Sequence, residues 1–167
     1  MAEIHVKGLA ALAKFLEAMP QKLAKNVLRG SLRAGMKPVQ VAARQNVHAV
    51  SGQLAKGLKI STRSKGDVVY SSLRATGKHG FVANFLEFGT KAHVIAAKKK
   101  KALTFNGEFY RRVNNNPGIG KGAKAFMRKS LDAQAGAALV AVGEYMKKRL
   151  AEKNGLDTAD IEIGIEP

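Results

Sequence analysis

The sequence predicts an α+β fold, in which a long kinked N-terminal helix and a long C-terminal helix pack a small antiparallel or mixed sheet. Apolar residues recur at helical spacing over residues 20–47 and again over residues 123–150. Between these stretches, short alternating segments bounded by turn residues indicate strands. The chain has 167 residues, of which 46% are hydrophobic, so it is long enough to bury a core.

The N-terminal quarter is expected to be helical. Leucines at helical spacing predict an amphipathic helix over residues 4–19, which ends at Pro20. A second helix is expected from Pro20 to Val47, with a kink at Pro38, because proline has no N–H to donate within the helix. Two glycines in this helix are compatible with close packing against another element: Gly30 and Gly35.

The middle of the chain alternates in the way strands do. Leu58–Thr62 predicts a strand, Ser64–Gly66 a three-residue hairpin loop, and Val68–Tyr70 the returning strand. A further strand is expected at His93–Ile95, with Leu103–Phe105 as its partner. These short strands account for the β part of the predicted fold.

The stretch from Phe81 to Thr90 is the most apolar part of the middle region. Phe81, Phe85 and Phe88 lie at i, i+4 and i+7, which favours a short helix that ends at Gly89. A strand with alternating faces is the other interpretation. In both, Glu87 lies among apolar residues and needs a hydrogen-bond donor, which makes it a scaffold carboxylate rather than a catalytic one.

Charge divides the chain into two regions. Lysine and arginine number 29 against 12 acidic residues, which gives a net charge of +17. Residues 152–167 carry a net charge of −4, so residues 1–151 carry +21. We therefore expect one α+β domain over residues 1–151, with a long mobile basic loop at about 96–122, and an acidic C-terminal arm over residues 152–167.

The arm contains three isoleucines at alternate positions: Ile161, Ile163 and Ile165. Such alternation gives a strand one apolar face. The arm is expected to add a strand to a sheet edge, in this chain or in a neighbouring subunit, and to act in assembly. Disorder of the isolated arm is the alternative.

No pattern for catalysis, a cofactor or a metal ion stands out. The four histidines are scattered, cysteine is absent, and no pair of carboxylates has the spacing of an acid–base site. Gly118–Lys124 lacks the spacing of a phosphate-binding loop. We therefore do not expect an enzyme. We also do not expect a membrane protein, because no apolar run approaches the ~20 residues that span a bilayer. Without a signal peptide, the chain is expected to begin in the cytosol.

The strong positive charge calls for nucleic acid, acidic protein partners or counterions. A solvated basic surface without a specific partner is the simplest alternative. Candidate contacts with DNA or with an acidic partner lie in and beside the predicted loop: Lys98, Lys99, Lys100, Lys101, Arg111, Arg112, Lys121 and Lys124.

Four ordered segments resemble one family: Val6–Leu12, Ser51–Ile60, Phe85–Thr90 and Pro117–Leu131. Together they resemble the HK97 gp10-like tail-completion, neck or head–tail joining proteins of tailed bacteriophages, over about residues 4–150. The chain has Ala125 where the family usually has proline, and its Lys98–Asn116 insertion is longer than expected. The residues that carry the family's structural motif are Gly52, Glu87, Phe88, Gly89, Thr90 and Phe126.

The resemblance implies a non-enzymatic structural virion protein of a tailed phage or a phage-derived particle. Such a subunit would form a ring, expected to be a hexamer, at the neck or head-proximal end of the tail, after assembly in the bacterial cytoplasm. Its expected partners are other copies of itself, head-connector or stopper proteins, tail-terminator or tail-tube proteins, and genomic DNA in the lumen, without sequence specificity. The alternative is a basic DNA-binding or DNA-packaging accessory protein.

Overall fold

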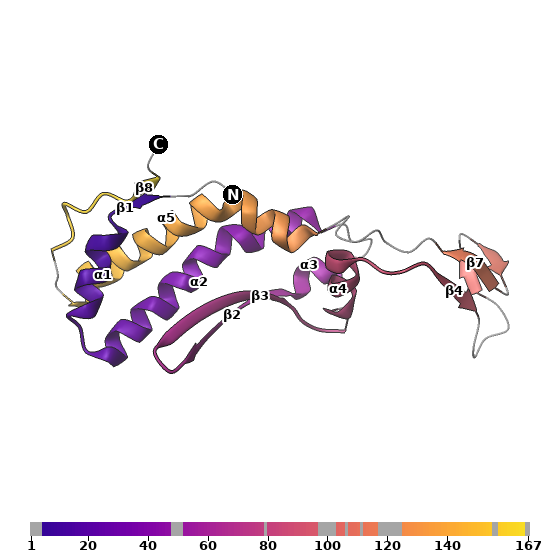
Figure 1. The fold of residues 1–167 in the computed structure, drawn as a ribbon, viewed down its shortest axis with the longest axis horizontal. Coiled ribbons are helices and arrows are strands. Elements are labelled where there is room, and N and C mark those ends of the chain that lie inside the picture. Colours follow the sequence, from indigo (N-terminus) through magenta and orange to yellow (C-terminus); the bar gives the residue numbers. More distant parts are fainter. Residues whose placement is uncertain are drawn as a thin grey trace. The chain divides into compact units, whose positions relative to one another are not determined.

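The fold is α+β, as the sequence predicts, with two long helices and small antiparallel sheets of two strands (Figure 1). The structure, a computed structural model, describes residues 5–47, 52–78, 80–96, 103–105, 107–110, 112–116, 125–154 and 157–165. The chain forms two compact units. Residues 1–80 and 126–167 make the first unit, and residues 81–125 make the second.

The helices α2 (Gln21–Asn46) and α5 (Phe126–Asn154) lie side by side in the first unit (Figure 1). A ridge of mostly small residues at four-residue intervals is buried along α2: Val27, Ser31, Gly35, Val39 and Ala43. A Cβ atom on Gly35 would lie 2.8 Å from the Ala138 carbonyl oxygen and 2.5 Å from Val142 Cγ2. Gly35 therefore lets the two backbones approach closely, as the sequence suggests.

A hydrogen-bond relay joins the C-terminal end of α2 to the first turns of α5. The Asn46 side-chain amide donates to Ser130 Oγ at 2.9 Å, and the Ser130 hydroxyl donates to the Phe126 carbonyl oxygen at 2.6 Å. Ser130 is fully buried, so both bonds satisfy a polar group that has lost its contact with water.

A hydrophobic cluster forms where α1 (Leu9–Glu17), α2 and α5 meet. Leu12, Val27, Met146 and Leu150 are its buried members, and Ile161 and Ile163 from the C-terminal arm pack against them. The chain ends of this unit also pair, since β1 (Val6–Lys7) runs antiparallel to β8 (Gly164–Ile165). The first helix therefore begins at Leu9, and the expected helix over residues 4–19 is too long at its start.

The β-hairpin of β2 (Leu58–Lys65) and β3 (Val68–Ala75) follows the short helix α3 (Gln53–Gly57). The expected three-residue loop at Ser64–Gly66 is wrong, because Lys65 still pairs with Val68. The turn consists of Gly66 and Asp67, and Gly66 takes a φ of 58°, a left-handed conformation that suits two-residue hairpin turns. Arg44 and Gln40 of α2 donate to the Leu58 carbonyl oxygen at 3.1 and 2.7 Å.

The second unit contains most of α4 (Gly80–Phe88) and two small sheets. β4 (His93–Ala96) pairs with β7 (Arg112–Asn116), and β5 (Leu103–Phe105) pairs with β6 (Glu108–Tyr110). The expected pairing of His93–Ile95 with Leu103–Phe105 is therefore wrong, because β4 and β5 each pair with another strand. The part of the predicted loop over residues 108–116 is largely strand, because backbone pairing overrides its asparagine-rich composition. Residues 117–122 of that loop lie outside the described ranges.

Candidate functional site

The helix α4 presents an aromatic face to solvent. The strand interpretation of this stretch is wrong, and Gly89 ends the helix with a φ of 82°, its N–H donating to the Phe85 carbonyl oxygen at 2.8 Å. The Phe81 and Phe85 rings meet edge to face, with centroids 5.9 Å apart. The exposed fractions are 60% for Phe81, 46% for Phe85 and 61% for Phe88. We call the surface formed by these three residues the Phe face.

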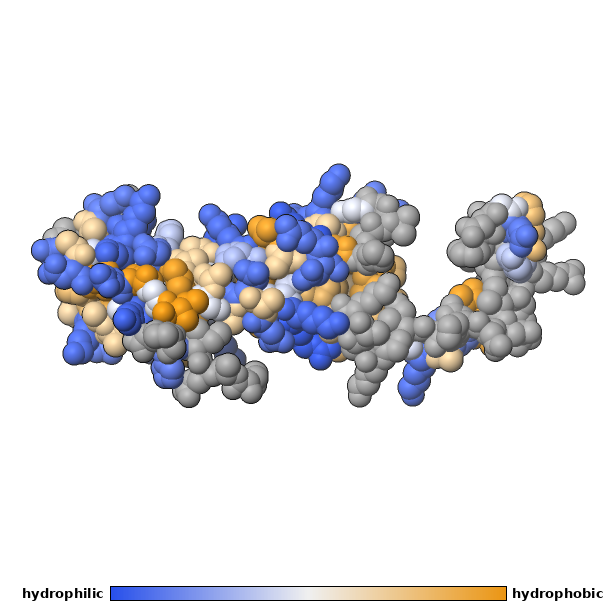
Figure 2. Space-filling view, turned by 90° about the horizontal axis from the view of Figure 1, so that it is seen from above, coloured by the Kyte–Doolittle hydropathy of each residue, from blue (hydrophilic) through white to orange (hydrophobic). Residues whose placement is uncertain are grey.

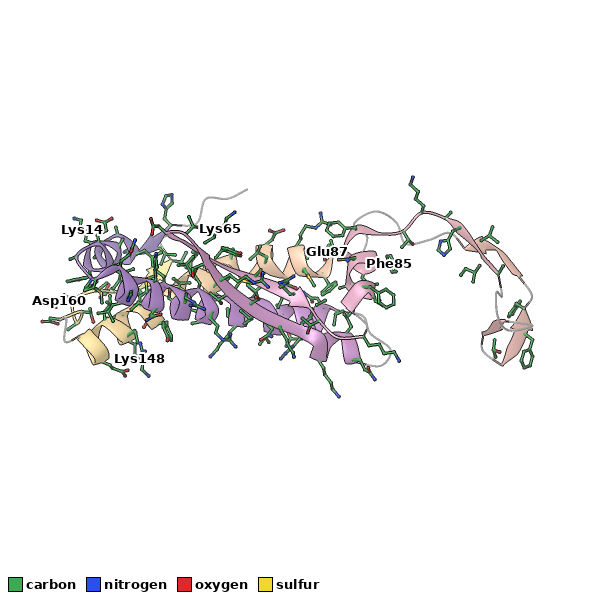
Figure 3. The ribbon with its side chains drawn as sticks, turned by 90° about the horizontal axis from the view of Figure 1, so that it is seen from below. Lys14, Lys65, Phe85, Glu87, Lys148 and Asp160 are labelled. Atoms are coloured by element: carbon green, nitrogen blue, oxygen red, sulfur yellow. The ribbon has the colours of Figure 1, made fainter. Side chains whose placement is uncertain are left out.

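Exposed apolar side chains that gather on one face are a feature of interaction surfaces. The opposite side of α4 is buried and includes Ala83, Leu86 and Glu87. Figure 3 shows the labelled side chains of Phe85 and Glu87 on different sides of the helix. The helix is thus amphipathic with its largest apolar residues outward, an arrangement that the i, i+4, i+7 spacing alone does not reveal.

Glu87 is buried, with only 5% of its surface exposed, as the sequence predicts. A buried carboxyl group depends on hydrogen bonds, and weakening them leaves a desolvated polar group. We expect Glu87→Gln to lower the free energy of unfolding by about 1–3 kcal/mol. Urea denaturation of both proteins measures the difference.

The matched control for Glu87 is Asn84→Ala, because Asn84 is an exposed polar residue of the same helix. Its substitution should change stability by less than about 0.5 kcal/mol. Equal denaturation midpoints for Glu87→Gln and the wild-type chain would contradict a structural role for this carboxyl group.

The remaining motif residues lie at different places in the fold. Gly52 precedes α3 with a φ of 64°, a conformation that favours glycine. Thr90 is half-buried. Phe126 begins α5 and has 2% of its surface exposed.

The C-terminal arm is docked on its own chain. The Lys147 ammonium donates to the Ile161 carbonyl oxygen at 2.5 Å, and a Cβ atom on Gly143 would lie 2.8 Å from Ile163 Cγ2. Ile165 keeps 55% of its surface exposed. Figure 2 shows a small apolar patch near the chain ends, within a largely hydrophilic face. Strand addition by the arm therefore occurs within this chain, and isolated disorder of residues 157–165 is wrong.

A basic groove lies between α2 and the β2–β3 hairpin, within the first unit. Its cavity has a volume of about 500 Å³. Four cationic residues line it: Arg33, Lys59, Arg63 and Arg74. The other lining residues are Ile60, Ser61, Thr62, Ala75 and Thr76, so no carboxylate takes part. These nine residues define the basic groove.

The basic residues that the sequence singled out are not placed together. Lys98–Lys101, Arg111, Lys121 and Lys124 lie outside the described residues, and Arg112 is described only as part of the β7 backbone. The groove residues were missed because they come from three separate segments, one on α2 and one on each strand of the hairpin. Two signals in the sequence point to them. Lys59 and Arg63 share one face of the predicted strand, and Asp67 is the one acidic residue from residue 18 to residue 86.

Neither a metal centre nor a membrane helix is found in the described part of the chain. No three histidine or acidic residues there are grouped so that they could hold a metal ion. No helix there has the length and apolar character needed to cross a bilayer.

Comparison with protein families identifies a match over about half of the chain. Residues 10–89 match the HK97-gp10-like family, described as "Bacteriophage HK97-gp10, putative tail-component". This range contains all of α1 except its first residue, together with α2, α3, the hairpin and α4, and it ends at Gly89. No match was found among curated proteins or among solved structures. The resemblance seen in the sequence is thus confirmed over residues 10–89, which are similar to the HK97-gp10-like family of bacteriophage tail components.

Proposed function

We propose that this chain is a tail-completion or neck subunit, which forms a ring at the head–tail interface of a tailed phage or a phage-derived particle. The observation that carries the proposal is the family match over residues 10–89. The ring is expected to be a hexamer. Its neighbours would be head-connector or stopper proteins on one side and tail-terminator or tail-tube proteins on the other.

Two surfaces support a role in assembly. The Phe face offers aromatic side chains, which are enriched in protein–protein interfaces. Among the described strands, β2 and β3 pair only with each other, and the edge of such a hairpin is a place where a strand from a partner can be added. The proposed activity is binding between subunits, with no reaction catalysed.

A DNA-binding or DNA-packaging accessory protein is the second candidate. The basic groove favours it, because cationic and hydroxyl side chains are the groups that contact phosphates. The two candidates differ in what assembly requires. A ring subunit needs apolar contacts between copies or neighbours, whereas an accessory protein needs only its basic surface.

The Phe face provides the test. Phe85→Ser should abolish incorporation of the chain into particles, because a polar hydroxyl replaces an aromatic anchor of the interface. The melting temperature of the isolated chain should change little, since Phe85 is already 46% exposed. Complementation of particle assembly, followed by quantification of the chain in purified particles, measures the effect.

Leu131→Ser is the matched control, because Leu131 on α5 is 47% exposed and lies outside the Phe face. It should enter particles as the wild-type chain does. Normal incorporation of Phe85→Ser would contradict the assembly role of this face.

A further inference from the structure

We propose that the basic groove between α2 and the β2–β3 hairpin is a binding site for the phosphodiester backbone of double-stranded DNA. This site differs from the loop lysines and arginines that the sequence singled out. It also does not depend on the position of the chain in a ring.

Two like charges lie opposite each other in the β2–β3 hairpin. Lys59 and Arg74 are directly opposed in the hairpin register, and both are exposed. Opposed residues of an antiparallel pair have their Cβ atoms about 4.5–5.5 Å apart, and like charges at that distance are destabilising. A bound anion converts this repulsion into two attractive contacts.

Further cations extend this charge in two directions. Arg63 lies on the same strand face as Lys59, four residues along β2. Arg33 reaches the groove from α2. Arg29 and Lys37 are one turn before and one turn after it on the same helical face. The result is a row of cations that suits an extended polyanion better than a single small anion.

Few acidic side chains in the described part of this chain are close enough to neutralise the cations of the groove. Asp67 is the one acidic residue between residues 18 and 86. Its carboxylate lies at the hairpin turn, where it is 3.0 Å from the Lys25 ammonium and accepts a 2.7 Å hydrogen bond from Gln21. No carboxylate lines the groove itself, so the charge of its four cations is left for an external partner.

The composition of the groove favours phosphate over an acidic protein. Protein interfaces have an apolar centre from which charged residues are depleted. In this groove Ile60 and Ala75 are the apolar members, beside four cations and three hydroxyl side chains. Arginine guanidinium groups bind phosphate through two parallel hydrogen bonds, and serine and threonine hydroxyls commonly contact phosphate oxygens. Contacts of this kind position a duplex without reading its sequence.

The test measures binding of a fluorescent 30-base-pair duplex of arbitrary sequence by anisotropy, over a series of salt concentrations. The groove variant is Lys59→Gln/Arg74→Gln. It should bind at least about tenfold more weakly, and the slope of log K against log salt should fall by about 2, because each lost phosphate contact contributes about 0.9. Arg33→Gln, a change on α2 that leaves the hairpin intact, should weaken binding in the same direction.

The matched control is Lys14→Gln/Lys148→Gln, which removes the same charge. Both residues lie near the α1 end of the first unit in Figure 3, away from the groove. The control should lose less than about threefold in affinity. The charge-preserving variant Lys59→Arg/Arg74→Lys should bind as the wild-type chain does, and equal melting temperatures verify that each variant is folded.

Two results would overturn the proposal. Equal losses for the groove and control variants would mean that binding follows net charge and involves no defined site. Loss of poly-glutamate binding in the groove variant, with DNA binding unchanged, would assign the groove to an acidic protein partner. Neither result bears on the Phe face, so the proposed ring subunit is tested separately.

Discussion

Replacing Leu150 by alanine should lower the free energy of unfolding of the first unit by about 3–5 kcal/mol. Leu150 is fully buried in the cluster with Leu12, Val27 and Met146. The substitution removes apolar contacts and leaves a cavity that helices on three sides close only in part. Chemical denaturation of the wild-type chain and the variant gives the difference from the shift in midpoint.

Leu131→Ala is the control for this substitution, since it removes the same atoms from α5 at a position that is 47% exposed. It should cost less than about 1 kcal/mol, because little buried surface is lost. Similar losses for both substitutions would contradict the assignment of the core to the junction of α1, α2 and α5.

Replacing Gly35 by valine should destabilise the fold by about 3 kcal/mol, at the upper end of the usual range for an overpacked core. The new Cβ would lie 2.8 Å from the Ala138 carbonyl oxygen, which is backbone, and 2.5 Å from Val142 Cγ2. Because the obstacle includes backbone, rotation of a side chain cannot relieve it, and α2 and α5 must move apart. Thermal unfolding monitored by circular dichroism measures the loss.

Gly136→Ala provides the comparison, as it also adds a Cβ to a helical glycine. There the added atom would meet the Ile165 side chain, whose Cδ1 lies 2.8 Å away and has room to move. This substitution should be nearly neutral or mildly stabilising, because alanine favours helix over glycine. An unchanged melting temperature for Gly35→Val would contradict close contact between the two long helices.

The periodic parts of the fold were predictable from the sequence. The stripe of α2, the long α5 and the short helix that ends at Gly89 follow from local spacing and from one glycine with positive φ. The strand at Leu58 was likewise evident from alternation. Such features depend on neighbours in the sequence, which is why a single chain reveals them.

Features that depend on distant residues were not predictable. The sequence left open which chain would receive the C-terminal arm, because Val6 and Ile165 pair across almost the whole length of the chain. The composition of Arg112–Asn116 predicts a loop, but its partner at His93–Ala96 supplies the pairing that makes it a strand. The basic groove was not predictable because it forms only when folding places α2 beside the β2–β3 hairpin. The outward orientation of the Phe face depended on which side of α4 is covered.

The most direct test of the assembly account is a reconstruction of purified tailed particles that contain this chain. The account predicts density for the chain as a ring between head and tail, at a fixed number of copies, with the Phe face against a neighbouring subunit. Absence of the chain from purified, infectious particles would contradict it.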